Sequence, residues 1–105
     1  MNAPTSDRFF LLRLTPPRPT FPADMIAEEG AVMQQHFGYW AGLSGERTAI
    51  VYGPVNDPSG TWGVAVIRVA DEAAARAIER GDPAIRAGLG FRYDIFPMPQ
   101  ALVAS

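Results

Sequence analysis

His36 is the only histidine of the chain and the side chain best suited to acid/base chemistry. Imidazole titrates near neutral pH without help from its surroundings. Asp57, in the turn-rich segment 53–60, could orient that ring by accepting a hydrogen bond from it. Each residue also has a structural interpretation, because a packed histidine usually finds a carbonyl or a water and an aspartate before proline commonly forms a turn. The residues alone leave both interpretations open.

Arginine supplies all nine basic side chains of the chain. Arg13, Arg68 and Arg92 each fall on a predicted strand, where a guanidinium could bind a carboxylate or phenolate through two hydrogen bonds. They could equally pair with Asp94 or another carboxylate, because buried charges are normally paired. Arg18 lies in a proline-rich segment and is expected to be solvated. If that segment folds over a pocket, Arg18 is the arginine best placed to meet an anionic ligand.

The aromatic residues favour packing over cofactor binding. Phe37 and Trp40 follow helical spacing and are predicted to lie in the core, whereas Tyr39 and Trp62 are free to line a pocket. No glycine pattern resembles a dinucleotide or phosphate loop. His36 has no histidine or cysteine companion at a metal-binding spacing. We therefore expect neither a cofactor nor a metal.

Composition limits the class of protein. The chain has 105 residues, enough for one domain, and its 48% hydrophobic and 19% charged residues are typical of a globular fold. A net charge of −2 gives no electrostatic basis for binding nucleic acid. Cysteine is absent, which excludes disulfides and thiolate metal sites. We see no signal peptide and no apolar run approaching a membrane span, so we expect a cytoplasmic protein without membrane contact.

The elements that position these residues follow from apolar runs and turn residues. Strands are predicted at 8–14, 48–52, 62–69 and 91–96. Helices are predicted at 24–43 and 71–80, with a further helical turn at 82–87 that begins with Asp82 and Pro83. This order predicts a ferredoxin-like α+β fold, βαββαβ, with a mainly antiparallel four-stranded sheet and two helices on one face. The single domain has its core at about 8–99, with tails at 1–7 and 100–105.

The first helix carries the histidine, so its orientation matters most. Asp24 is expected to cap it. Four apolar residues fall on one face at about 100° per residue and are predicted to meet the core: Ile26, Met33, Phe37 and Trp40. His36 lies about 70° from the centre of that face and is therefore expected at the margin of the core.

The first predicted strand indicates a homodimer. Phe9 and Leu11 point to one side of it, and Phe10 and Leu12 point to the other. Because the helices can cover only one face of the sheet, the second apolar face is predicted to pack against the sheet of another copy.

The chain resembles the YCII-related family of small proteins over residues 8–99. The resemblance is carried by the first strand 9–13, the helix segment 35–43, the turn 53–57, the passage from the third strand into 71–73, and the segment 82–89. It implies a dimeric α/β barrel and a paired histidine and aspartate that map onto His36 and Asp57. Ala84 departs from the family pattern, in which a bulky apolar residue often follows Asp-Pro, and this departure bears on the shape of a pocket wall. Relatives include a dehydrochlorinase of chlorinated hydroxyhydroquinones.

Three functions follow. The first is a small dimeric enzyme that performs cofactor-free, lyase-like acid/base chemistry on a small anionic or phenolic molecule through His36 and Asp57. The second is a non-catalytic module that binds a small ligand on the same scaffold. The third is a structural assembly protein, which leaves His36 without a role. A hydrogen-bonded imidazole and carboxylate beside a pocket would favour the enzyme.

Overall fold

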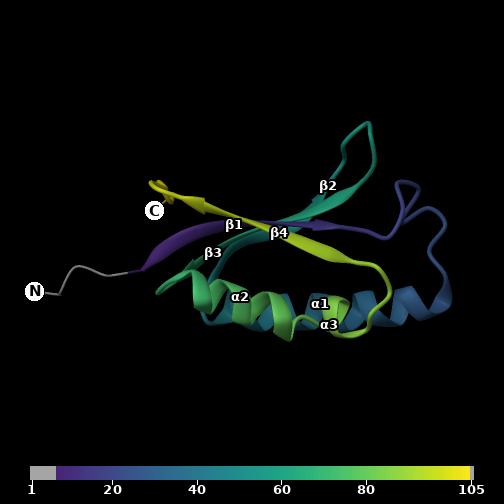
Figure 1. The fold of residues 1–105 in the computed structure, drawn as a ribbon, viewed down its shortest axis with the longest axis horizontal. Helices are drawn as coiled ribbons and strands as arrows, with labels where there is room; N and C mark the ends of the chain where they lie inside the picture. Colours follow the sequence, from purple (N-terminus) through teal and green to yellow (C-terminus); the bar gives the residue numbers. More distant parts are fainter. Residues whose placement is uncertain (1–6, 105) are drawn as a thin grey trace, which may run out of the picture.

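Four antiparallel strands form one sheet, and all the helices lie on one of its faces (Figure 1). The computed structural model describes residues 7–104. Its elements are β1 (Arg8–Thr15), α1 (Ala27–Gly45), β2 (Ala49–Val55), β3 (Trp62–Val69), α2 (Glu72–Gly81), the single turn α3 (Pro83–Arg86) and β4 (Arg92–Met98). The strand order is β2-β3-β1-β4. The predicted βαββαβ order and antiparallel four-stranded sheet are confirmed.

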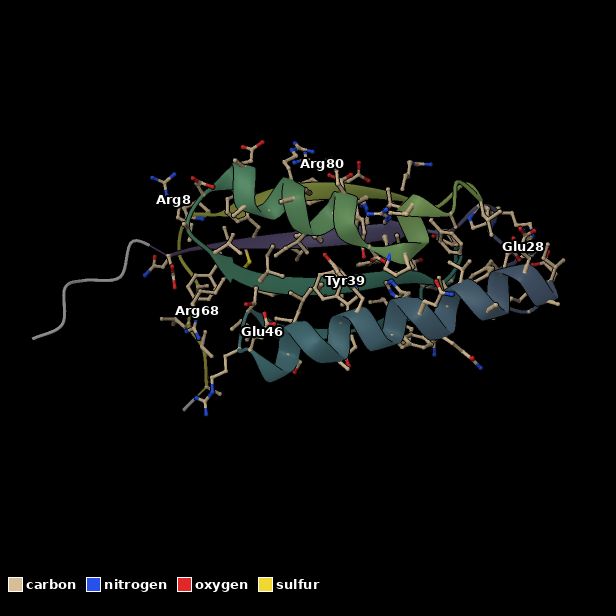
Figure 2. All side chains as sticks on the ribbon, turned by 90° about the horizontal axis from the view of Figure 1, so that it is seen from below. Arg8, Glu28, Tyr39, Glu46, Arg68 and Arg80 are labelled. Carbon is tan, nitrogen blue, oxygen red and sulfur yellow. The ribbon has the colours of Figure 1, made fainter. Side chains whose placement is uncertain are left out.

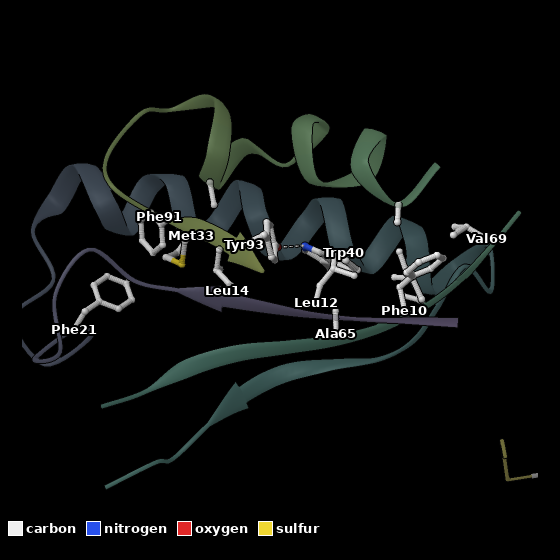
Figure 3. Close-up of a cluster of buried hydrophobic side chains, with 14 residues drawn as sticks. Phe10, Leu12, Leu14, Phe21, Met33, Trp40, Ala65, Val69, Phe91 and Tyr93 are labelled. Carbon is white, nitrogen blue, oxygen red and sulfur yellow. Dashed lines mark hydrogen bonds between the residues drawn. The ribbon is translucent and has the colours of Figure 1, made fainter. Parts of the chain in front are cut away.

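The core lies between the sheet and the helices. Along β1, Phe10, Leu12 and Leu14 point inward and are buried, because successive side chains of a strand alternate between its faces. They meet inward residues of β3 and β4, and α1 adds Trp40, which is 1% exposed (Figure 3). Burial of one large apolar side chain stabilises a fold by roughly 1.5–3 kcal/mol, so this alternation fixes which face of β1 turns inward.

Helix α1 begins three residues later than its predicted cap. Its N-cap is Ile26, whose backbone N–H donates to the carboxylate of Glu29 over 3.1 Å. Asp24, expected as the cap, lies before the helix and pairs with Arg18. An aspartate caps only when its side chain faces the free N–H groups of the first turn, and Arg18 holds Asp24 elsewhere.

The buried face of α1 is rotated from the predicted one. Met33 and Trp40 are buried as expected, but Phe37 is 54% exposed and Ile26 is 55% exposed. The residues that pack inward also include Val32, Tyr39 and Leu43. At about 100° per residue the centre of this face falls beside position 36. His36 therefore lies in the middle of the packed face, and the prediction that it lies at the margin is wrong.

Helices α2 and α3 meet at a single acidic residue. Asp71 caps α2 through the N–H of Ala74, and Asp82 caps α3 through the N–H of Ala84, with Pro83 in the first helical turn. Both caps agree with the prediction.

Tyr39 joins α1 to α2. Seen from the helical side, its side chain points toward the space between the two helices (Figure 2). Its hydroxyl donates to the carbonyl of Ile78 over 2.8 Å, which ties the two helices together.

The opposite face of the sheet carries no helix (Figure 1). Leu11 lies at its centre, paired with Val66 of β3 and Phe96 of β4. Paired residues of neighbouring strands point to the same face, so these three side chains form an apolar patch. Phe96 is 44% exposed there. The prediction that β1 is apolar on both sides is confirmed, and no helix of the described residues covers its second side.

Candidate active site

The His36 ring is held by a fully buried carboxylate. Its Nδ1 atom lies 2.9 Å from Oδ2 and 3.0 Å from Oδ1 of Asp82. The side chain of Asp82 has no exposed surface, and that of His36 is 12% exposed. The two residues are 46 positions apart in the chain and meet because α1 packs against the start of α3. This contact has the length of a charge-assisted hydrogen bond.

Every oxygen of Asp82 is engaged. Oδ1 accepts from the Ala84 N–H over 2.9 Å, and Oδ2 accepts from the Trp40 indole over 2.9 Å and from the Tyr93 hydroxyl. Burial raises the pKa of Asp82, but the donors His36, Tyr93 and Trp40 outweigh it and hold the pKa below its ordinary value. Burial and the nearby carboxylate raise the pKa of Tyr93, so its hydroxyl remains a donor. Asp82 is therefore an anion surrounded by hydrogen-bond donors, two of which, Trp40 and Tyr93, are themselves joined by a hydrogen bond of 3.1 Å (Figure 3).

A pocket of about 260 Å³ opens beside this pair. His36 lines it together with Trp40, Tyr52 and Tyr93. With Nδ1 on Asp82, the ring's Nε2 has no hydrogen-bond partner among residues 7–104. Buried polar atoms are almost always paired, and no such buried atom is orphaned in the described part of the chain, so this nitrogen is accessible to solvent or ligand.

The hollow exists because β3 presents small residues to the helices at this end. Gly63 and Ala65 occupy inward positions opposite Leu14 and Leu12 of β1. A methyl group added at Gly63 would lie 3.4 Å from Leu14, so β1 already approaches closely there. Larger residues at these two positions would fill the space that the pocket occupies.

The proline-rich segment 16–25 forms one wall of the pocket. Phe21 packs edge-on against Phe91, with ring centroids 5.3 Å apart. Arg18 secures the segment to α1 through two bonds to Glu29, of 2.8 and 2.7 Å, and also bonds Asp24 over 2.9 Å. These hydrogen bonds lower the pKa of Glu29 and of Asp24 and raise that of Arg18. The side chain of Arg18 is 32% exposed, so it remains in part solvated as expected, but two carboxylates also hold it.

Two glycines with positive φ lie close to the proline-rich segment 16–25. Gly60, at φ 134°, would place a Cβ 3.1 Å from the Pro19 carbonyl, and Gly90, at φ 101°, would place one 3.1 Å from the Pro17 side chain. Both conformations suit glycine, and both close approaches leave no room for a side chain. The segment is thus fixed at α1, at the β2–β3 turn and at the start of β4.

Asp57 is not part of the pair formed by His36 and Asp82. Its Oδ1 accepts from the backbone N–H of Ser59 over 2.9 Å and from that residue's hydroxyl over 2.7 Å, and its Oδ2 accepts from the Trp62 indole over 3.0 Å. These bonds lower its pKa to about 2. The predicted partnership of Asp57 with His36 does not form in this chain, and Asp82 takes that position. Asp57 reaches the pocket only through Trp62, which lines it.

The arginines predicted to bind a ligand lie away from the pocket. Arg13 pairs with Asp94 over 3.2 Å on the open face of the sheet and stacks on Phe96, the pairing weighed as the alternative. Arg68 donates to the carbonyl of Arg47 over 3.4 Å, and Arg92 is exposed.

Two further predictions concern the pocket wall. Tyr39 is half-buried between helices, where burial raises its pKa, and it does not line the pocket. Ala84 is fully buried in the core and does not line the pocket either, so its departure from the family pattern leaves that wall unchanged.

Sequence reasoning missed Asp82 and Tyr93 as members of the site. Asp82 was interpreted only as a helix cap, and that interpretation is correct for one of its oxygens. The other oxygen accepts from Trp40 and Tyr93, and no local pattern in the sequence indicates these two contacts. Among residues 7–104, no group of three or more histidine, aspartate or glutamate side chains is arranged to hold a metal ion. In the same residues no helix is long and apolar enough to cross a membrane.

Comparison with known proteins agrees with this architecture. No curated protein matches the chain. The model of the YCII-related domain matches residues 10–99, which contain every element from β1 to β4 except the first residues of β1. The match also spans His36, Asp82 and all the residues that line the pocket. The chain therefore belongs to the YCII-related family.

Proposed function

We propose that this protein is a small enzyme that transfers a proton without a cofactor, with His36 as its general acid/base. One observation carries the proposal: the His36 ring lines a pocket while its Nδ1 rests on the buried carboxylate of Asp82. A base whose ring is oriented by a second group beside a cavity is the recurrent arrangement of acid/base catalysis.

In the proposed mechanism each nitrogen of the ring has its own role. Asp82 accepts the Nδ1 proton, which selects the tautomer with a lone pair on Nε2. Nε2 takes a proton from a weakly acidic C–H or O–H group of the substrate, and the Asp82 carboxylate stabilises the imidazolium that forms. The same proton then passes to the product or the leaving group. Loss of a leaving group after proton abstraction is the lyase-like reaction implied by kinship, and a positioned base contributes about 10²–10⁴-fold to such a step.

A homodimer packed sheet against sheet belongs to the proposal. The patch formed by Leu11, Val66 and Phe96 supports it, because a contiguous apolar sheet face in contact with water favours association. Sedimentation of wild-type protein should give a dimer. Leu11→Glu, which places a charge at the centre of the patch, should give a folded monomer. Phe37→Glu changes an exposed aromatic residue on α1 and should remain a dimer.

The alternative is a binding module that uses the same pocket without turnover. Its support is that apolar residues and aromatic rings make up most of the pocket wall, as in many ligand sites. A turnover screen separates the two functions. Small phenols and chlorinated hydroxyquinols would be incubated with wild type, His36→Gln and His36→Ala, with Gln34→Ala as a control on the exposed side of α1. We expect turnover by wild type and the control only. Ligand binding without turnover in wild type would favour the module, and turnover that survives both His36 variants would exclude the acid/base role.

A further inference from the structure

The charges around the pocket point to the class of molecule that it binds. We infer that the pocket takes an uncharged, one-ring ligand that can form a hydrogen bond, in place of the anion that the arginine-rich sequence favours. The inference rests on the site proposed above and concerns its ligand.

The wall of the pocket has few free polar groups. The indole N–H of Trp40 is bound to Asp82, and that of Trp62 is bound to Asp57. The hydroxyl of Tyr93 is likewise bound to Asp82. Among the polar side chains that line the pocket, His36, Tyr52 and Thr61 remain available to a ligand. Such a wall rewards apolar contact and leaves only these few side chains to recognise the polar part of a ligand.

No unpaired charge faces the cavity from the described residues. Arg18 lies over Phe21 of the wall, with its Cζ 5.9 Å from the ring centroid, but Glu29 and Asp24 already neutralise it. Arg13, Arg68 and Arg92 do not line the pocket. A carboxylate or phosphate that entered would lose its water and meet no free guanidinium, which disfavours its binding.

A cationic ligand meets no free carboxylate either. No aspartate or glutamate lines the pocket, and the nearest carboxylate, Asp82, has both oxygens occupied by His36, Trp40, Tyr93 and Ala84. The size of the pocket narrows the class of ligand further. The pocket volume of about 260 Å³ lies just below the range of roughly 300–1,000 Å³ typical of ligand sites, which suits a molecule built on a single ring.

Three probes of nearly equal shape test the charge: benzyl alcohol, benzoate and benzylammonium. Binding is followed by NMR through the ring of His36 and the indole N–H signals of the two tryptophans. Trp40 and Trp62 both line the pocket, so no turnover is needed. We expect benzyl alcohol to bind at least about tenfold more tightly than either ion. Benzoate and benzylammonium would each have to lose the water around their charge without gaining an oppositely charged partner. Equal or tighter binding of benzoate or benzylammonium would overturn the inference, as would a failure of all three to bind.

Substitutions at Ala65 and Asp24 test whether the probes bind in this pocket and why the charged ones bind weakly. Ala65→Leu fills the hollow and should abolish the shifts caused by benzyl alcohol, with Ala65→Val as a milder change if leucine prevents folding. Asp24→Asn removes one of the two carboxylates that neutralise Arg18 and should narrow the gap between benzyl alcohol and benzoate. An unchanged gap would contradict the role given to Arg18.

The outcome is independent of catalysis. His36→Gln abolishes turnover if the proposed function is correct, yet it should preserve the preference for the uncharged probe. Conversely, a wild-type protein that prefers benzoate would overturn the ligand class and leave the acid/base role of His36 standing.

Discussion

The Nδ1 atom of His36 lies 2.9 Å from Oδ2 of Asp82, a carboxylate with no exposed surface. Because Asp82 is buried among four donor residues, its removal should cost far more than a single hydrogen bond. We expect Asp82→Ala to lower the free energy of unfolding by about 3–5 kcal/mol, since the donors of His36, Tyr93 and Ala84 lose their acceptor and Trp40 keeps only its bond to the Tyr93 hydroxyl. Asp82→Asn keeps the shape and one acceptor oxygen and should cost about 1–3 kcal/mol. Urea denaturation measures both, and an Asp82→Ala cost below about 1 kcal/mol would contradict this set of hydrogen bonds.

The second prediction concerns the tautomer of the His36 ring. Hydrogen bonding to Asp82 should keep the proton on Nδ1 whenever the ring is neutral, which leaves Nε2 bare. Nitrogen-15 NMR reports this directly, and the chain has no other histidine to obscure the signal. Asp82→Asn should produce a mixture of tautomers. Asp57→Asn is the matched control and should leave the ring unchanged, so a tautomer that responds to Asp57 alone would refute the assignment.

The third prediction concerns the acid sensitivity of the β2–β3 turn. Folding lowers the pKa of Asp57 from 3.8 to about 2, so the ionised carboxylate stabilises the folded state above pH 3.8, and this contribution is lost as the pH falls from 3.8 toward 2. Asp24, Glu29 and Asp82 also have lowered pKa values, so the informative quantity is the difference between wild type and Asp57→Ala. Melting temperatures of the two proteins should differ most at neutral pH and converge near pH 2. A constant difference across this range would show that the charge of Asp57 is immaterial.

The fourth prediction concerns the contact between α1 and the end of α2. A Cβ added at Gly81 would lie 2.7 Å from the Tyr39 hydroxyl, which is held by the carbonyl of Ile78. Gly81→Ala should therefore cost about 1–3 kcal/mol of stability despite the better helix propensity of alanine. In a Tyr39→Phe background the clash with the hydroxyl is gone, and the same substitution should cost less. Additive effects of the two changes would exclude the clash.

Much of the fold could be predicted from the sequence because its signals are local. Aliphatic and aromatic runs that end at proline or glycine mark the strands, and the predicted range 62–69 coincides with β3. Asp71 and Asp82 cap helices as their flanking residues indicate. The start of α1 could not be predicted in the same way, because Asp24 is drawn to Arg18 across the proline-rich segment.

The site was only half predictable. His36 stands out by residue type, but its partner depends on a contact between residues 46 positions apart. Asp57 resembles a partner because it lies in a turn near the pocket, and its oxygens are instead satisfied by Ser59 and Trp62. The predicted face of α1 differs from the true one because it includes the exposed Ile26 and Phe37 and omits the residues on the other flank that pack inward, which are Val32, Tyr39 and Leu43.

The proline-rich wall has one more consequence. Arg18, Gly60 and Gly90 hold that wall in place before any ligand arrives, so the conformational entropy of ordering it is spent during folding and not during binding. An incoming molecule meets a finished surface and needs no closing lid. Small ligands, which make few contacts, gain most from such a rigid receptor, and a change of preferred ligand within this scaffold would come from exchanged side chains and not from altered loop motion.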